Sequence, residues 1–384
     1  MRAALAGLLA MAAAMGIGRF VYTPILPLMI GEQALDAGDA GLVAGANYLG
    51  YLLGAIVASA GVFVGRRRFW FSCGLAASLA TTAAMGLGPG FAAMAATRFL
   101  SGVASAFAMI FVTSIVMSQL AQARRPGLIA LHFGGVGFGI AGSAALVTLL
   151  SSADFHWQAI WLWSAAAAAI AAALAWIVLP AVPPAPVQPA VSRRSGLPAS
   201  VRPLATLIVS YGLFGFGYVV TATFINAMAR ADPALAPVEP WVWMVVGLSG
   251  APSVWAWNRV SAWSRPAIAY AAACLAEAAG VALSVLVIHP AALLLSALLL
   301  GATFMAVTSI GLAQARQMSP ANPARPIALM TAAFGFGQML GPIAAGFLFQ
   351  RTGNLYLASM LAALALALSA CLALLADRFA RVAA

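Results

Sequence analysis

The chain carries very little charge. Only 7% of its 384 residues are Asp, Glu, Lys or Arg, whereas about 25% is usual in a soluble domain. Hydrophobic residues make up 64% of the chain, and the mean hydropathy is +1.01. A soluble domain cannot bury that much apolar surface, so the composition excludes a soluble globular protein.

Residues that perform chemistry are also scarce. The chain contains eight acids, three His and three Cys, and Cys73, Cys274 and Cys371 each lie inside an apolar run. Such cysteines behave as small hydrophobic side chains and predict no disulfide framework. No cluster has metal-ligand spacing, no Ser-His-Asp set is available, and no glycine-rich phosphate loop follows a strand. We therefore expect no catalytic residues, no metal, no cofactor and no use of ATP.

Long apolar runs, by contrast, are abundant. A helix that crosses a bilayer needs about 20 apolar residues. Twelve such runs occur, at residues 3–30, 39–64, 69–88, 91–119, 128–150, 158–179, 203–228, 241–258, 266–288, 291–314, 327–350 and 355–376. The first run begins like a signal peptide, but it continues to Ile30 and has a counterpart later in the chain, which favours a retained helix. The sequence predicts an all-α membrane protein with 12 transmembrane helices.

A proline-rich, basic break divides the chain almost in half. Residues 181–202 read AVPPAPVQPAVSRRSGLPASVR, which is typical of a solvated linker. We therefore expect a six-helix bundle at 1–180, a cytoplasmic linker at 181–202 and a second six-helix bundle at 203–384.

The arginines are distributed unevenly among the loops. With the N-terminus in the cytoplasm, cytoplasmic segments hold fifteen of the nineteen arginines, and the opposite loops hold only Arg230 and Arg351 with six of the eight acids. Because basic residues favour the cytoplasmic side of a membrane, we expect both termini in the cytoplasm. This rule accounts for the pI of about 10.8 without a nucleic-acid partner.

Three short strings recur in the same order in both halves. Gly16-x-Gly18 corresponds to Gly215-x-Gly217, Val112-Thr-Ser-Ile to Val307-Thr-Ser-Ile, and Gly135-x-Gly137 to Gly335-x-Gly337, at offsets of 199, 195 and 200 residues. Each half has six predicted spans, and an even number gives both halves the same orientation. The sequence therefore predicts a parallel repeat.

This organisation resembles the major facilitator superfamily over nearly the whole chain. The strings GIGRFVYTPILPLM from Gly16, ANYLGYLLG from Ala46 and YGLFGFGY from Tyr211 look like its YbfB/YjiJ-type bacterial branch. Arg98-Phe-Leu-Ser-Gly102 is similar to the Arg-x-x-x-Gly motif of span 4. The resemblance implies two pseudo-symmetric six-helix bundles with spans 1, 4, 7 and 10 around a central cavity.

Two strings depart from the superfamily's pattern. GVFVGRRR, residues 61–68, lacks the usual Asp of the loop between spans 2 and 3. Residues 134–142 of span 5 contain no Pro, whereas many drug/proton antiporters have a Gly-Pro pattern there. The motifs therefore do not support drug antiport.

Three ionisable side chains lie well inside spans: Arg19, Arg98 and Glu277. A charge at the bilayer centre costs at least about 2.5 kcal/mol, so each should face a partner, a cavity or water. The resemblance places Arg19 and Arg98 on cavity helices. A guanidinium stays protonated and its planar fork suits a carboxylate or phosphate, which makes both arginines candidates for binding an anionic substrate. For Arg98 the alternative is that it satisfies carbonyls left free near Phe20 and Thr23 by the prolines of span 1.

Glu277 and His132 are the candidates for proton coupling. A buried carboxyl can bind and release a proton, and the imidazole of His132 titrates in the useful range. Each residue also has a structural interpretation. Glu277 can remain neutral and bond a neighbouring helix, and His132 can be a ring at the membrane interface.

Neutral polar side chains complete the predicted substrate site. On the helices that the resemblance assigns to the cavity these are Tyr22, Tyr218, Thr221, Asn226 and Thr308. Asn47, Tyr48 and Gln338 lie on helices predicted to form the interface between the halves. Each of these side chains can equally bond a neighbouring helix.

The leading hypothesis is a secondary active transporter of the bacterial inner membrane. It would carry a small anionic or zwitterionic organic solute by alternating access, as a monomer, with proton coupling left open. One alternative is a membrane-embedded enzyme acting on a lipid-linked substrate, for which the paired acids or His near one face are missing. The other is a non-transporting membrane sensor, for which an added soluble domain would be expected.

Overall fold

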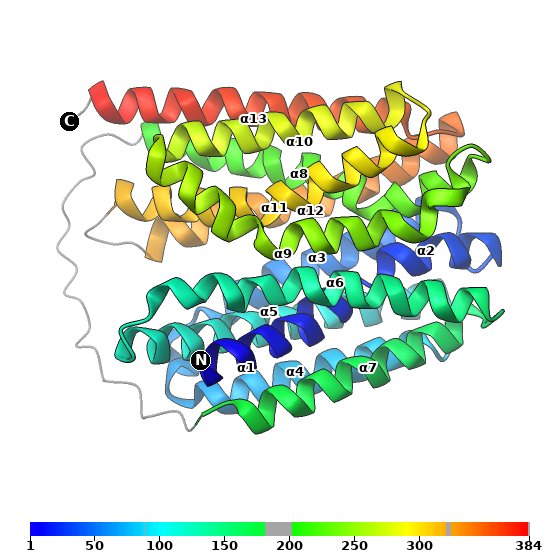
Figure 1. Ribbon diagram of the computed structural model, residues 1–384, viewed down its shortest axis with the longest axis horizontal. Coiled ribbons are helices and arrows are strands. Elements are labelled where there is room, and N and C mark those ends of the chain that lie inside the picture. The colour runs from blue at the N-terminus through cyan, green and yellow to red at the C-terminus, as the bar shows by residue number, and fades with distance from the viewer. Residues whose placement is uncertain (89, 181–201, 320–323, 383–384) are drawn as a thin grey trace.

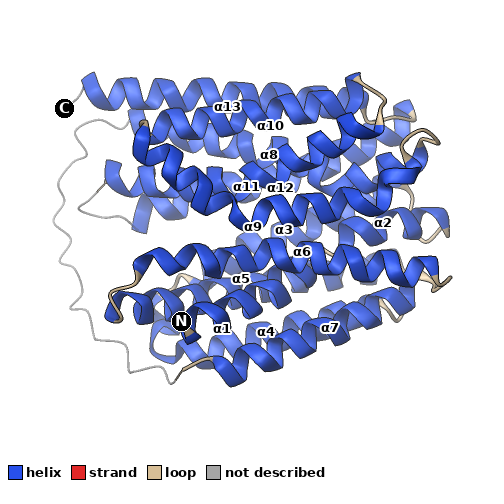
Figure 2. Cartoon of the chain, viewed as in Figure 1, coloured by secondary structure: helices blue, strands red, loops and turns tan. Residues whose placement is uncertain are grey.

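The computed structural model describes residues 1–88, 90–180, 202–319 and 324–382, and over these residues it is helical with short connections and no strand (Figure 2). The predicted linker lies outside the described residues except for Arg202. The predicted domain boundaries therefore stay a prediction.

The first half contains six spans, the first of which is built from three helical segments. Their bounds are α1 Arg2–Met11, η1 Ala12–Ile17 and α2 Tyr22–Gly31, then α3 Ala37–Ala58, α4 Arg67–Met85, α5 Phe91–Gln122, α6 Ile129–Ser152 and α7 Trp157–Val178. The six spans of the second half are α8 Arg202–Ala231, α9 Glu239–Trp263, α10 Pro266–Leu286, α11 Pro290–Met318, α12 Ala324–Thr352 and α13 Tyr356–Val382. Short 3₁₀ segments occupy η2 Gly61–Arg66, η3 Pro126–Leu128 and η4 Ala236–Val238.

Ten of the spans described are long and apolar enough to cross a membrane, and α4 and α9 complete the predicted twelve. Helices suit this setting because they satisfy every backbone polar group within the segment. Most ends of the predicted spans lie within a few residues of the ends of the helices. Span 2 was expected to reach residue 64, but α3 ends at Ala58 and the apolar residues after it form η2. Apolar composition alone does not distinguish an α-helix from a 3₁₀-helix.

The two halves repeat the same packing. In the first half α3 and α4 pack on α5, and α1 packs on α6 and α7. In the second half the corresponding pairs are α9 and α10 with α11, and α8 with α12 and α13. The fold is therefore two pseudo-symmetric six-helix bundles, as predicted from the repeat.

Three pairs of helices make most of the contact between the bundles. These are α3 with α12, α6 with α9, and α2 with α8, so the interface combines spans 1, 2 and 5 with spans 7, 8 and 11. In Figure 1 the first half lies below and the second above, and α1 begins and α13 ends towards the same side. Gln350 Nε2 donates to Asp36 at 3.0 Å, and Thr148 donates to the Pro240 carbonyl at 3.4 Å. These hydrogen bonds join the halves at the end away from the termini.

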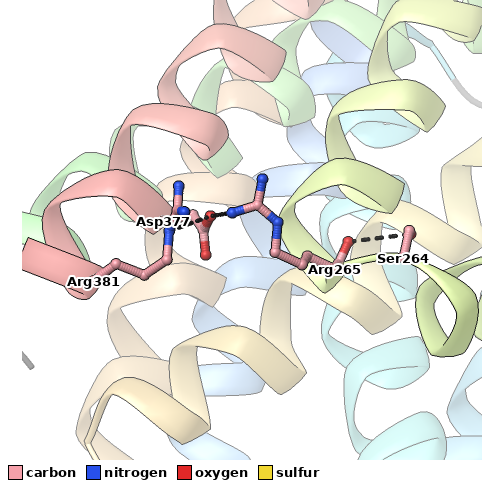
Figure 3. Close-up of polar contacts among 4 residues, drawn as sticks. All are labelled: Ser264, Arg265, Asp377 and Arg381. Carbon is pink, nitrogen blue, oxygen red and sulfur yellow. Dashed lines mark hydrogen bonds and ion pairs between the residues drawn. The ribbon is translucent and has the colours of Figure 1, made fainter.

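One acid links two helices at the end that holds the termini. Asp377 on α13 accepts from Arg265 at 3.1 Å and lies 3.2 Å from Arg381 Nε, one turn further along the same helix (Figure 3). Arg265 stands directly before α10. The acid therefore connects α10 to α13 where the helices leave the bundle.

Candidate functional site

Helix 1, the span built from α1, η1 and α2, is interrupted near its centre. Residues Ala12–Ile17 form a π-helical segment, the chain turns through residues 18–21, and α2 begins at Tyr22. Pro24 has no amide proton, and the Phe20 carbonyl accepts instead from the Thr23 amide at 3.2 Å. That amide is the regular helical partner of the Arg19 carbonyl. The Arg19 carbonyl is therefore left for another donor.

Arg98, on α5, supplies that donor. Its Nη2 donates to the Arg19 carbonyl at 2.9 Å and its Nη1 to the Gly18 carbonyl at 3.2 Å. Its side chain is buried, and the guanidinium lies 5.2 Å from the ring centroid of Tyr22. The sequence had pointed to the carbonyls near Phe20 and Thr23, whereas these bonds go to Gly18 and Arg19. In this conformation Arg98 stabilises the break in helix 1 and thereby positions Arg19.

Arg19 is buried without an acidic partner. Its guanidinium carbon lies 3.9 Å from the ring centroid of Tyr51 and 4.8 Å from that of Tyr48, both on α3. The Nη2 atom is 3.5 Å from Gln338 Oε1, which is long for a hydrogen bond, and Nε has no hydrogen-bond partner among the described residues. None of the ion pairs formed by the described residues includes Arg19. The charge is held by aromatic faces, by the weak hydrogen bond to Gln338 and by a polar contact with Tyr51.

Gln338 connects Arg19 to the second half. Its Oε1 faces Arg19 and its Nε2 donates to the Tyr218 hydroxyl. Arg19 is on helix 1, Gln338 on α12 and Tyr218 on α8. The Gln338 amide therefore joins a chain of polar groups that crosses the interface between the bundles.

An apolar pocket adjoins this polar chain. Its lining residues come from both halves and are Phe20, Ile140, Tyr218, Ala222, Trp243, Val246, Leu300 and Phe304. The Phe20 ring lies 6.4 Å from Trp243 and 6.3 Å from Phe304, and Tyr218 is nearly parallel to Phe304 at 6.1 Å. In this conformation the pocket has room for about one water molecule. Aromatic rings thus border a small space next to Phe20, whose ring contacts the Arg19 guanidinium.

Three other residues predicted to bind the substrate carry hydroxyl groups, and two of these groups already donate a hydrogen bond to a backbone carbonyl. The Tyr22 hydroxyl donates to the Ala40 carbonyl at 2.9 Å, within the first bundle. Thr308 Oγ1 donates to the Phe304 carbonyl of its own helix at 3.0 Å. Thr221 is buried, and its hydroxyl has no hydrogen-bond partner among the described residues. Of these three, only Thr221 retains a free polar group that a solute could use.

Asn226 lies in a different place from Arg19. Its Nδ2 donates to Glu239 Oε1 at 2.9 Å and to the Glu239 carbonyl at 3.2 Å. These residues line a second pocket between the halves, together with Arg230 and Thr148. This pocket also has room for about one water molecule. The structure therefore does not bring Asn226 together with the Arg19 cluster, which consists of Arg19, Tyr48, Tyr51 and Gln338.

Glu277 lies one layer behind the aromatic pocket. It is completely buried on α10, and its Oε2 is 2.9 Å from Thr303 Oγ1 on α11. The same hydroxyl donates to the Leu299 carbonyl at 2.7 Å. Thr303 adjoins Phe304 in the chain, and Phe304 lines the pocket. Glu277 therefore contacts the helix that carries part of the pocket wall.

His132 is buried within the first bundle rather than exposed at the membrane interface. Its exposure is 0%, and its Nε2 lies 3.0 Å from Thr113 Oγ1 on α5. Gly7 on α1 packs so closely that a Cβ there would clash with the imidazole Nδ1. Glu277 and His132 thus lie in different halves. No group of three His, Cys, Asp or Glu residues that could hold a metal occurs in the part of the chain that the structure describes.

Several residues around Arg19 and the pocket were not identified as site residues from the sequence, among them Phe20, Phe304, Tyr51 and Trp243. Tyr51 is the ring nearest to the Arg19 guanidinium, and Trp243 lines the pocket with an indole N–H that has no partner among the described residues. A signal for Tyr51 was available, because it follows Tyr48 by three residues and shares its helix face. Nothing in the sequence distinguishes Trp243 from the other tryptophans.

Comparison with known proteins identifies relatives that share this architecture. The family described as "Uncharacterised MFS-type transporter YbfB" matches residues 11–374. The "Uncharacterized MFS-type transporter YceJ" of Bacillus subtilis (strain 168) is 26% identical over 221 residues, and the match spans 56% of this chain and 56% of that protein.

Solved structures share the fold at low sequence identity. A mutant form of the nucleoside transporter NupG has a TM-score of 0.74 at 16% identity and covers 98% of this chain and 99% of its own. A bacterial homolog of the human lysosomal transporter Spinster, in an inward-facing and occupied conformation, has a TM-score of 0.68 at 14% identity, covering 97% and 96%.

Proposed function

This chain belongs to the YbfB-type branch of the major facilitator superfamily, and from that premise we propose that it carries a small organic anion across the membrane by alternating access. In this proposal Arg19 binds the anionic group. The protein is a multi-pass membrane transporter and not an enzyme, so the alternative of an enzyme acting on a lipid-linked substrate is wrong. We further propose the bacterial inner membrane as its location, with both termini in the cytoplasm. A monomeric state stays a prediction.

The observation that carries this proposal is the unpaired charge of Arg19. A buried cation without a counterion is costly, because aromatic faces and the polar contacts with Gln338 and Tyr51 replace only part of its hydration. A bound carboxylate would remove that cost and form charge-assisted hydrogen bonds with the planar fork. Arg98 also lacks an acidic partner among the described residues, and its Nε has no partner there, but its two Nη groups donate to backbone carbonyls.

The position of Arg19 suits alternating access. Its neighbours Tyr48 and Tyr51 belong to the first bundle, whereas Gln338 belongs to the second. A solute bound there would contact both bundles and would be released to one side when the bundles rotate apart on that side. The Arg19 cluster therefore has the location that a transported solute requires.

A nucleoside is the competing solute class, because the solved neighbour NupG is a nucleoside transporter. At 16% identity that likeness shows only the fold. Nucleosides carry no net charge, so they would leave the Arg19 cation uncompensated. The buried charge favours an anion over a nucleoside.

We also propose that Glu277 takes part in proton coupling. Its contact with Thr303 supports this, because a hydroxyl has one proton and Thr303 directs a hydrogen bond to the Leu299 carbonyl. Both contacts are satisfied together when Glu277 carries a proton and donates it to Thr303 Oγ1. Loss of that proton would leave a buried, unpaired carboxylate next to the pocket wall. His132 stays a candidate in the first half, where its buried ring contacts Thr113.

The test of anion recognition compares acids with their amides. Purified protein is heated with each member of a panel of four- to ten-carbon carboxylic acids at millimolar concentration, in parallel with the matching carboxamides. We expect stabilisation by at least one acid and by none of the amides, since a ligand that binds the folded state raises its unfolding temperature.

Variants at position 19 complete this test. Arg19→Lys keeps the charge but loses the fork and should bind the selected acid more weakly, and Arg19→Ala should not bind it. Arg351→Ala, which removes an arginine at an exposed helix end, is the matched control. If Arg19→Ala is folded and binds the acid with wild-type affinity, or if no acid stabilises the wild type, the proposal is wrong.

A further inference from the structure

The aromatic pocket beside Arg19 indicates which kind of organic acid the protein selects. We propose that the transported solute is an aromatic carboxylate, whose carboxylate binds Arg19 and whose planar ring occupies the pocket formed by Phe20, Trp243, Phe304 and Tyr218. This inference rests on the proposed function, because it requires the anionic group to be held by Arg19.

Phe20 connects the charged and the apolar parts of the site. It follows Arg19 directly in the chain, its ring centroid lies 5.5 Å from the Arg19 guanidinium carbon, and its ring lines the pocket. On the other side Tyr218 lines the pocket and accepts from Gln338, whose carbonyl faces Arg19. Phe20 therefore contacts the guanidinium and lines the pocket, and Gln338 links the guanidinium to Tyr218. A ligand that reaches both the guanidinium and the pocket has its charge and its apolar part separated by a short linker.

Two lining rings of the second bundle, Tyr218 and Phe304, belong to a series of stacked rings that continues outside the pocket to Phe334 and Phe214. Tyr218 lies parallel to Phe334 within 3° at 5.8 Å and parallel to Phe304 within 14° at 6.1 Å. Phe214 continues the stack, at 5.2 Å from Tyr218. Such a set of rings presents flat faces and edges, and it favours another planar ring over an aliphatic chain of equal size.

The pocket lies at the boundary between the two bundles, which alternating access would move apart. Phe20 and Ile140 belong to the first bundle, and the other lining residues belong to the second. In this conformation the space holds about one water molecule, so a ring enters only when the bundles move apart. Trp243 adds an indole N–H without a partner among the described residues, which offers a donor to a polar atom of the ligand.

The experiment measures ring selectivity at constant charge. Wild-type protein is titrated with phenylacetate, 3-phenylpropionate and indole-3-acetate, and with cyclohexylacetate and 3-cyclohexylpropionate, the saturated analogues of the first two. Phenylacetamide is the neutral control. We expect each phenyl acid to bind roughly threefold to tenfold more tightly than its saturated analogue, which is the range for one or two aromatic contacts, and the amide not to bind.

A substitution in the pocket locates the selectivity. Phe304→Leu removes one ring at similar volume, so phenylacetate and cyclohexylacetate should then bind almost equally while cyclohexylacetate keeps its wild-type affinity. Phe336→Leu, at an exposed phenylalanine of α12, is the matched control and should retain the selectivity.

The possible outcomes separate this inference from the proposed function. If the saturated acids bind as tightly as the aromatic ones in the wild type, the aromatic selectivity is wrong and anion recognition by Arg19 stands. If the aromatic acids do not bind and other acids do, the inference is also wrong. If no acid of any kind binds, the proposed function fails together with it.

Discussion

Two buried arginines of the first bundle differ in what their guanidinium groups contact. Arg98 donates to the carbonyls of Gly18 and Arg19, both of which belong to the interrupted part of helix 1. The guanidinium of Arg19 contacts the rings of Tyr48 and Tyr51 and the amide of Gln338. The hydrogen bonds of Arg98 are therefore with backbone, and we propose that Arg19 is the arginine that binds the ligand.

Arg98→Lys should destabilise the protein. An ammonium group cannot place two donors as the planar fork does, so at least one charge-assisted hydrogen bond to helix 1 is lost, at a cost of about 1.5–3 kcal/mol. Thermal unfolding in detergent measures this, with Arg19→Lys as the control, because Arg19 supports no backbone carbonyl. If Arg98→Lys unfolds at the wild-type temperature but loses affinity for the transported acid, then Arg98 is a ligand-binding residue.

Glu277→Gln should separate binding from energy coupling. The amide can still contact Thr303 but cannot release a proton, so counterflow exchange of the transported acid in proteoliposomes should persist while accumulation driven by a pH gradient is lost. Glu239→Gln, at the second pocket between the halves, is the control and should accumulate the acid. Accumulation that survives in the double variant Glu277→Gln with His132→Ala would show that neither residue couples protons.

At the scale of helices, a close contact between the bundles depends on small residues. α3 and α12 approach so closely that a Cβ on Gly41 would clash with the Pro342 carbonyl, and one on Gly346 with the Ala37 carbonyl. Glycine at these places lets the two backbones touch. Because this contact lies beside the Asp36 and Gln350 hydrogen bond, it closes the end of the molecule away from the termini.

Gly41→Val should therefore impair both stability and transport. The added side chain forces α3 from α12, and overpacking of this kind costs about 1–3 kcal/mol. Gly142→Val is the control, since a Cβ at Gly142 meets no atom within 4 Å. Unfolding temperature and counterflow rate are measured for both variants. Equal values for Gly41→Val and Gly142→Val would mean that the contact between α3 and α12 is not needed to close that end.

At the scale of the whole molecule, the orientation in the membrane is open to a direct test. Fifteen of the nineteen arginines lie in segments predicted to be cytoplasmic, which predicts the cytoplasmic side for both termini. A reporter fused after Leu235 should lie outside, and one fused within residues 185–200 should lie in the cytoplasm. Alkaline phosphatase and a fluorescent protein that matures only in the cytoplasm distinguish the two sides. The same side for both fusions would contradict the twelve-span topology.

Much of the fold could be predicted from the sequence because its signals are local. Apolar length determines where a helix can span the bilayer, and the recurrence of Gly16-x-Gly18 as Gly215-x-Gly217 marks the repeat. The spans, the parallel halves and the family were therefore predicted and are confirmed. The position of Arg19 inside a span was equally visible, since a charge in an apolar run is apparent from the sequence alone.

Only the tertiary structure decided which residues surround that charge. Gln338 is 319 positions from Arg19 in the chain and reaches it because α12 packs on α3 across the interface. Phe20, Trp243 and Phe304 meet because helix 1, α9 and α11 converge there. In a chain this apolar, aromatic and small residues are common in every span, so composition does not show which of them face one another. That is decided by the crossing of helices from the two bundles, which leaves Arg98 bonded to backbone carbonyls and Arg19 without an acidic partner among the described residues.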